Sequence, residues 1–89
     1  MSRPTGNTPF PETARGLHPR QYAPDGMAVV EAERPIPVRA WIVTVRGDDR
    51  EVDGDVMAWT RKAVRLRYVD KYGHLDSAWI WANAVIGRR

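Results

Sequence analysis

The 89-residue sequence contains no cysteine, so disulfide bonds and thiolate metal ligands are excluded. It has no apolar run as long as a membrane span, and its polar, proline-broken start lacks the apolar core of a signal peptide. These absences predict a soluble, cytoplasmic protein. Lysine is also scarce, because arginine supplies most of the basic residues. That composition favours a small bacterial or bacteriophage protein.

Proline is absent after residue 37, although seven prolines precede that point, and all four tryptophans lie in the proline-free part. We therefore expect a proline-containing flexible arm over residues 1–35 and a compact domain over residues 36–89. Residues 25–37 fit either an added strand or a lead into the domain. A domain this small gains only about 3–5 kcal/mol from its core, so it needs tight aromatic packing, a partner or self-association.

The proline-free part contains short runs rich in β-branched and aromatic residues, separated by turn signals. These runs predict strands at residues 38–46, 52–60, 63–70, 75–81 and 85–86. Asp53-Gly54 indicates a bulge or bend near the start of the second strand. Because no segment has a convincing helical pattern, we expect an all-β protein built as a small barrel.

Residues 79–85 (WIWANAV) resemble the closing stretch of SH3-like barrels, in which a 3₁₀ turn around an asparagine precedes the last strand. The resemblance covers about residues 38–87 and implies five antiparallel strands beside a largely extended or disordered N-terminal arm. It implies that Ile80 points inward, that Asn83 lies in the turn and that Val85 begins the last strand. It does not extend to the proline-peptide-binding subfamily, because Trp81 and Ala84 stand where that subfamily has ligand-contacting proline and tyrosine.

Alternation along the strands predicts two faces. The inward residues are expected to be Val56, Ala58, Val64, Leu66, Tyr68, Ala78 and Ile80. The outward residues, which form the candidate binding surface, are expected to be Trp59, Arg65, Arg67, Trp79 and Trp81. Large exposed aromatic residues are uncommon on small monomers unless something covers them.

Three covers are open for this surface. The first is the arm, through Pro9-Phe10-Pro11 or Tyr22. The second is a protein partner or a second copy of the chain, and the third is single-stranded nucleic acid. Two alternatives need no ligand: a structural cation–π ladder, or a reversed face that buries the tryptophans.

No catalytic, cofactor-binding or metal-binding residues are expected. The loop Asp49-x-Glu51-x-Asp53-Gly54 resembles half of a calcium loop, but Thr60 stands at its twelfth position and strand-like sequence flanks it. The two histidines have no evident third metal ligand. We therefore interpret the chain as a non-catalytic protein-interaction module. The alternative is a nucleic-acid-binding barrel that uses Arg61, Lys62 and the outward residues, which the net charge of +3 permits.

Overall fold

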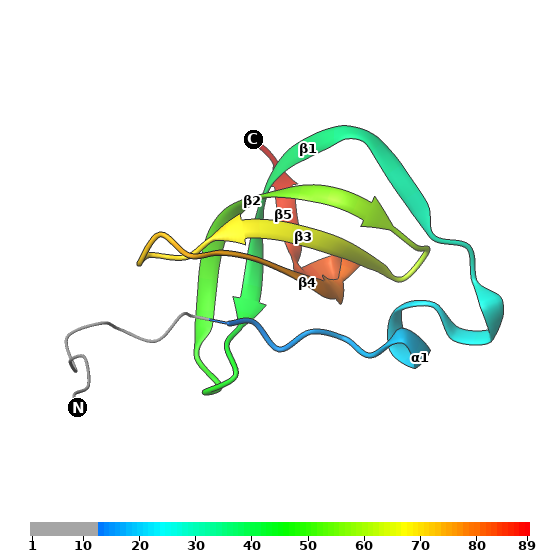
Figure 1. Cartoon of the computed structure of the whole chain (residues 1–89), viewed down its shortest axis with the longest axis horizontal. Coiled ribbons are helices and arrows are strands. Elements are labelled where there is room, and N and C mark those ends of the chain that lie inside the picture. The colour runs from blue at the N-terminus through cyan, green and yellow to red at the C-terminus, as the bar shows by residue number, and fades with distance from the viewer. Residues whose placement is uncertain (1–12) are drawn as a thin grey trace, which may run out of the picture.

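The computed structural model describes residues 13–89, and the calls made on residues 1–12 lie outside the described part. Five antiparallel strands form one sheet in the order β4-β3-β2-β1-β5 (Figure 1). The prediction of an all-β fold with five antiparallel strands is confirmed. The strands are β1 (Val30–Val43), β2 (Asp49–Trp59), β3 (Ala63–Val69), β4 (Leu75–Trp81) and β5 (Val85–Arg88). The helical turns are α1 (Pro19–Tyr22), η1 (Pro24–Gly26) and η2 (Ala82–Ala84).

The closing stretch has the predicted conformation. The 3₁₀ turn η2 contains Asn83, and β5 begins at Val85. Ile80, two residues before η2, is buried in the core. The core also holds the largest fully buried side chains, which are Tyr68, Ile42 and Leu66. Six of the seven predicted inward residues are confirmed, because Val56, Leu66, Tyr68 and Ile80 are buried in the core and Val64 and Ala78 pack against it. Ala58 is also buried, but it lies outside the core cluster, opposite Arg65 of β3.

The boundary expected at residue 36 falls inside β1. This strand starts at Val30 and continues through Pro35 and Pro37. Its register with β2 shifts between Glu31 and Ile36, an interval that contains Pro35, whereas Pro37 is paired with Asp55. Proline is tolerated in a strand where no main-chain N–H is required. The open question about residues 25–37 is thus answered, because their second half belongs to the sheet.

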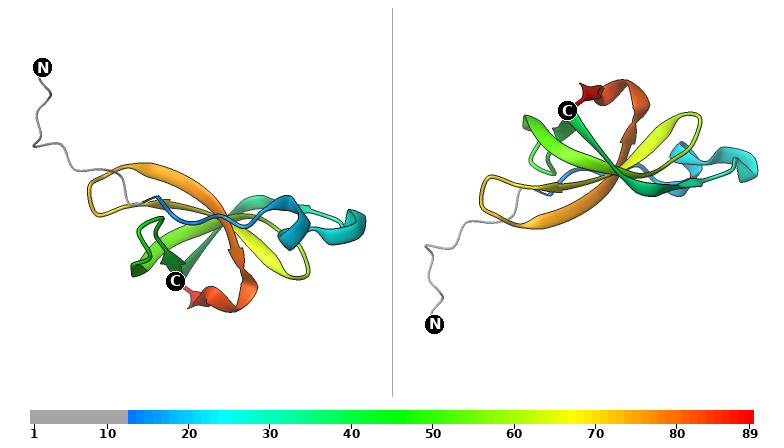
Figure 2. Two further views of the ribbon diagram at one scale, coloured as in Figure 1. Left: turned by 90° about the horizontal axis from the view of Figure 1, so that it is seen from below. Right: turned by 90° about the horizontal axis from the view of Figure 1, so that it is seen from above.

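Residues 13–22 run beside β4, and η1 lies past the turn between β2 and β3, as Figures 1 and 2 show. The N–H of Arg15 donates to the carbonyl of Val43 at 2.7 Å, and the N–H of Leu17 donates to the carbonyl of Trp79 at 2.9 Å. The segment therefore passes from the end of β1 to β4, the last strand of the sheet. It is extended, as expected, but it is docked, because an edge strand presents unpaired main-chain groups that attract another segment.

The hydroxyl of Tyr68 fixes this segment from inside the core. It accepts a hydrogen bond from the N–H of Ala14 at 2.9 Å and donates to the carboxylate of Asp76 at 3.4 Å. Ala14 itself is buried and forms a β-bridge with Thr44. Burial raises the pKa of Tyr68 to about 12, because the phenolate would lose its hydration in the core.

This pKa makes the stability depend on alkaline pH. Unfolded tyrosine releases its proton near pH 10, whereas folded Tyr68 keeps it to about pH 12. The free energy of unfolding should therefore fall by about 1.4 kcal/mol between pH 9 and pH 11, as measured by urea denaturation. Tyr68→Phe should lack this loss and should be less stable at pH 7 by about 1–3 kcal/mol, because the N–H of Ala14 loses its partner. Equal pH dependence in both proteins would contradict the assignment.

Of the bulge or bend expected at Asp53-Gly54, the bulge is absent, because Gly54 pairs with Val38 of β1 in an unbroken register. A Cβ atom at this position would lie 2.6 Å from the carbonyl oxygen of Arg67 and 2.9 Å from Cδ1 of Leu66. Glycine is needed here because β3 approaches β2 too closely for any side chain. The short distance involves main-chain oxygen, which cannot move aside as a flexible side chain would.

Gly54→Ala should lower the free energy of unfolding by about 1–3 kcal/mol, the usual cost of forcing extra volume into a packed site. Gly87→Ala is the matched control, because a Cβ atom there would meet nothing within 4 Å. Chemical denaturation of both variants measures the difference. Equal stabilities would show that β2 and β3 can separate without cost.

Candidate interaction surface

A β-bulge in β2 decides the face on which Trp59 lies. The register between β2 and β3 shifts between Val56 and Ala58, so simple alternation fails there. Beyond the shift, Trp59 pairs with Val64, and directly paired residues share a face. Both side chains pack against the core. The expectation that Trp59 lies on the outer face is therefore corrected, because one additional residue in the strand reverses its direction.

The other four predicted residues share the outer side of β3 and β4. Arg65 lies directly opposite Trp79 in the β3–β4 pairing. Trp81 is the most accessible of the aromatic residues here, with 42% of its surface exposed. We call the following four residues the Arg/Trp surface: Arg65, Arg67, Trp79 and Trp81.

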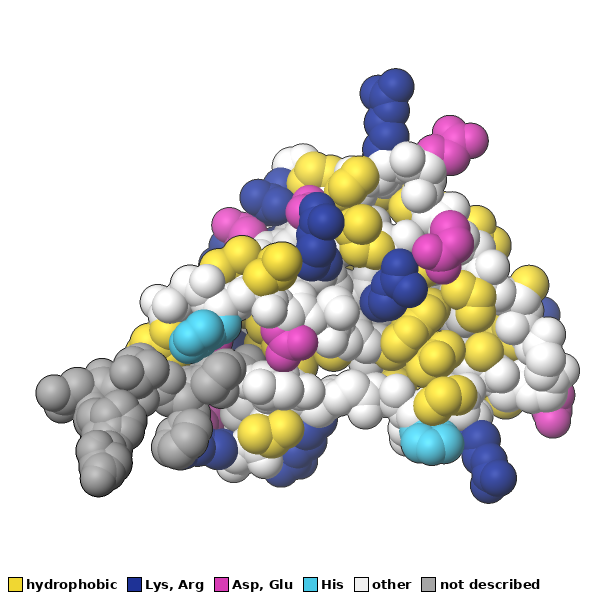
Figure 3. Space-filling model, in the orientation of Figure 1, with side chains coloured by type: hydrophobic (Ala, Val, Ile, Leu, Met, Phe, Trp, Pro, Cys, Tyr) yellow, Lys and Arg dark blue, Asp and Glu magenta, His cyan; other side chains and the backbone are white. Residues whose placement is uncertain are grey.

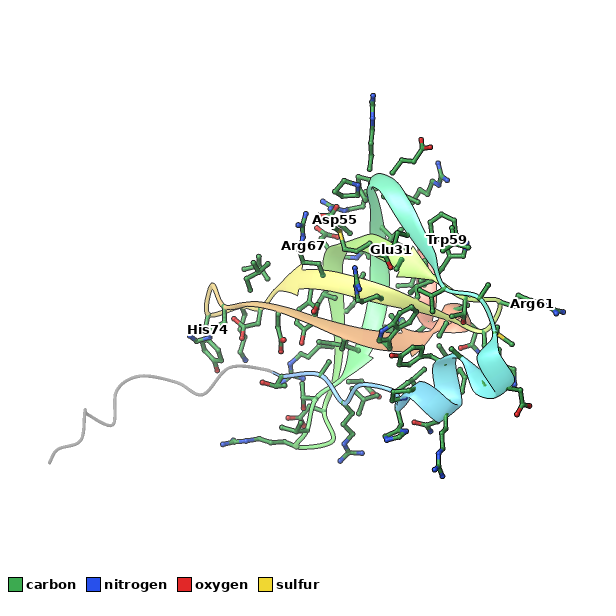
Figure 4. The ribbon with its side chains drawn as sticks, turned by 45° about the vertical axis from the view of Figure 1, so that its right-hand side comes forward. Glu31, Asp55, Trp59, Arg61, Arg67 and His74 are labelled. Atoms are coloured by element: carbon green, nitrogen blue, oxygen red, sulfur yellow. The ribbon has the colours of Figure 1, made fainter. Side chains whose placement is uncertain are left out.

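The two arginines of the Arg/Trp surface are paired with carboxylates. A guanidinium nitrogen of Arg65 lies 3.2 Å from the carboxylate of Glu31, and one of Arg67 lies 3.3 Å from that of Asp55. Arg89 reaches the same Asp55 at 3.5 Å. Figure 4 shows Glu31, Asp55 and Arg67 on the same side of the sheet. In Figure 3, basic and acidic side chains lie beside one another across this side, among hydrophobic ones. The surface is therefore charge-compensated.

Tyr22 covers one residue of the Arg/Trp surface. Its ring is stacked on the indole of Trp79, with the ring centres 4.0 Å apart and the planes only 5° from parallel. The carbonyl of Tyr22 accepts a hydrogen bond of 2.6 Å from the buried hydroxyl of Thr60. The first of the three expected covers is thus present, and it leaves Trp81 exposed.

Tyr22→Ala should uncover Trp79. We expect the tryptophan emission to move to longer wavelength, acrylamide quenching to increase, and the free energy of unfolding to fall by about 1 kcal/mol through loss of the aromatic pair. Tyr72→Ala is the control, because Tyr72 is exposed in the turn between β3 and β4. Identical emission from the two variants would show that the stack does not persist in solution.

Trp41 is an exposed aromatic residue that the sequence interpretation missed. It has 46% of its surface exposed, more than any other tryptophan, and lies on β1 between the buried Ala40 and Ile42. Apolar residues occupy both odd and even positions of this strand, so alternation in the sequence does not show which way the side chain of Trp41 points. The available signal was Arg39, which is two positions away and therefore on the same face.

Two residues of the acidic loop expected from the sequence, Glu51 and Asp53, lie in β2 and bind a side chain of the protein itself. Arg39 pairs with Glu51 and with Asp53, the latter at 2.6 Å, and these hydrogen bonds raise the pKa of Arg39. Within residues 13–89, no group of three or more histidine and acidic side chains is arranged to hold a metal ion. His74 instead lies 3.3 Å from the buried carboxylate of Asp70, which also accepts hydrogen bonds from the main chain of its turn.

No protein-family model matches this chain, and neither a curated protein nor a solved structure is significantly similar to it. The helices between residues 13 and 89 are too short and too polar to traverse a lipid bilayer.

Proposed function

We propose that this protein is a non-catalytic interaction module, an SH3-like barrel that binds a protein partner or a second copy of itself through the Arg/Trp surface. The strand order β4-β3-β2-β1-β5, with a 3₁₀ turn between β4 and β5, supports the SH3-like assignment. A cytoplasmic accessory role in a bacterium or bacteriophage is the setting that the composition favours.

The observation that carries this proposal is an exposed tryptophan on a charge-compensated surface. Trp81 offers a large apolar area, and tryptophan is enriched among the residues that contribute most to protein–protein affinity. Arg65 and Arg67 are already paired with Glu31 and Asp55, so a phosphate would have to compete with these carboxylates. The surface therefore suits a protein better than a nucleic acid backbone.

A displayed library of random 12-residue peptides tests the proposal with the full chain as bait. We expect selected peptides to bind the wild-type protein and to lose at least about tenfold in affinity with Trp81→Ala, because a central aromatic anchor is removed. Trp41→Ala is the matched control, since Trp41 is similarly exposed on another strand. Fluorescence anisotropy with the synthetic peptides measures both affinities.

The alternative function predicts different behaviour. An oligothymidine titration followed by tryptophan quenching should show no binding, whereas a nucleic-acid-binding barrel would give quenching that weakens steeply between 50 and 200 mM salt. Such a result, or peptide binding that depends on Trp41 rather than Trp81, would contradict the proposal. The mass in solution at several concentrations identifies a second copy as the partner.

A further inference from the structure

One end of the outer side is hollowed where the turn between β2 and β3 meets η2. A cavity of about 300 Å³ lies there, lined by Lys62, Trp81, Ala82 and Asn83. All four residues are exposed. It is large enough for one side chain and its flanking backbone, and the indole of Trp81 supplies its main apolar wall.

The main chain around this hollow is held from several sides. The hydroxyl oxygen of Thr60 accepts hydrogen bonds from the N–H groups of Lys62 and Ala63, both at 3.1 Å, while it donates to Tyr22. The carbonyl of Lys62 accepts from the N–H of Ala82 at 2.9 Å, which joins the turn to η2. A ligand therefore meets a preorganised backbone and does not have to order it.

The charge at the hollow differs from the charge on the rest of the outer side. Arg65 and Arg67 are compensated by carboxylates, whereas Arg61 and Lys62 have no carboxylate partner within residues 13–89. Figure 4 shows Arg61 projecting from the turn into solvent. Two uncompensated positive charges thus lie on the turn that borders the exposed Trp81.

We propose that this hollow binds an acidic segment of a partner protein, in which carboxylates flank one apolar side chain. The apolar side chain packs on the indole of Trp81, and the carboxylates pair with Lys62 and Arg61. The amide of Asn83 offers a donor and an acceptor to the backbone of the segment. This assignment rests on the proposed function and adds to it the site and the chemical class of the partner.

An acidic protein segment fits better than nucleic acid for an electrostatic reason. Nucleic acid binding gains affinity from a row of phosphate contacts, each made by a free basic group. Here the free basic groups are only two adjacent residues, and the neighbouring outer side carries Glu31 and Asp55 close to its arginines. Two cations are sufficient for a short acidic segment, while a polynucleotide would continue across these carboxylates.

The composition of the selected library peptides tests this inference. We expect peptides selected on the full-length protein to be enriched in aspartate and glutamate beside an aromatic or aliphatic residue. Their affinity should fall at least about fivefold with Lys62→Glu and more with Trp81→Ala, and Lys62→Arg should retain it. Lys71→Glu is the matched control, because it makes the same charge change in the turn at the opposite end of β3. Thermal melting confirms that the variants are folded.

Each result has a distinct meaning. Selected peptides that depend on Trp81 but lack acidic enrichment, or that bind Lys62→Glu and wild type equally, would overturn the acidic-segment inference and leave the interaction module intact. Failure to select any peptide would remove both proposals. Binding of oligothymidine that is lost in Lys62→Glu would assign the hollow to nucleic acid and overturn the inference.

Discussion

A sheet that ends at β4 exposes a row of main-chain donors and acceptors with which another segment can pair. Residues 13–17 supply partners by pairing with the end of β1 and with Trp79 of β4. The hydroxyl of Tyr68 ties the same segment to the core through Ala14. The pairing of this segment also brings the ring of Tyr22 onto Trp79 and the carbonyl of Tyr22 within hydrogen-bonding distance of Thr60.

Thr60 connects the docked N-terminal segment with the candidate site. One buried hydroxyl holds the main chain of Lys62 and binds the carbonyl of Tyr22, so the segment that covers Trp79 and the turn that borders Trp81 share an anchor. A polar group this well satisfied stabilises one local arrangement, because breaking any of its bonds would leave buried groups without partners. The two adjacent outer tryptophans therefore differ in availability: one is covered by the chain, and the other remains open.

The sequence predicts the local parts of this fold well. The order Ile80, Asn83, Val85 is read over a few residues, and alternation in β3 and β4 reports burial directly. Prediction from the sequence fails where the position of a residue depends on distant parts of the chain or on one additional residue in a strand. The bulge after Val56 reverses Trp59, and no local signal in the sequence indicates it. Leu17 and Tyr22 look isolated in the sequence, because their partners lie in β4. The exposure of Trp41 was not predicted, because β1 has apolar residues at both odd and even positions.

The docked N-terminal segment also affects the order in which the chain can fold during synthesis. Ala14 lies 54 positions before the tyrosine that binds it, so this early segment leaves the ribosome well before its partner. Contacts between residues so far apart form slowly, because the intervening loop must close first. The meander from β2 to β4 is built from neighbouring strands and can form before the segment docks. We therefore expect the residues made earliest among those described to be among the last to reach their native positions.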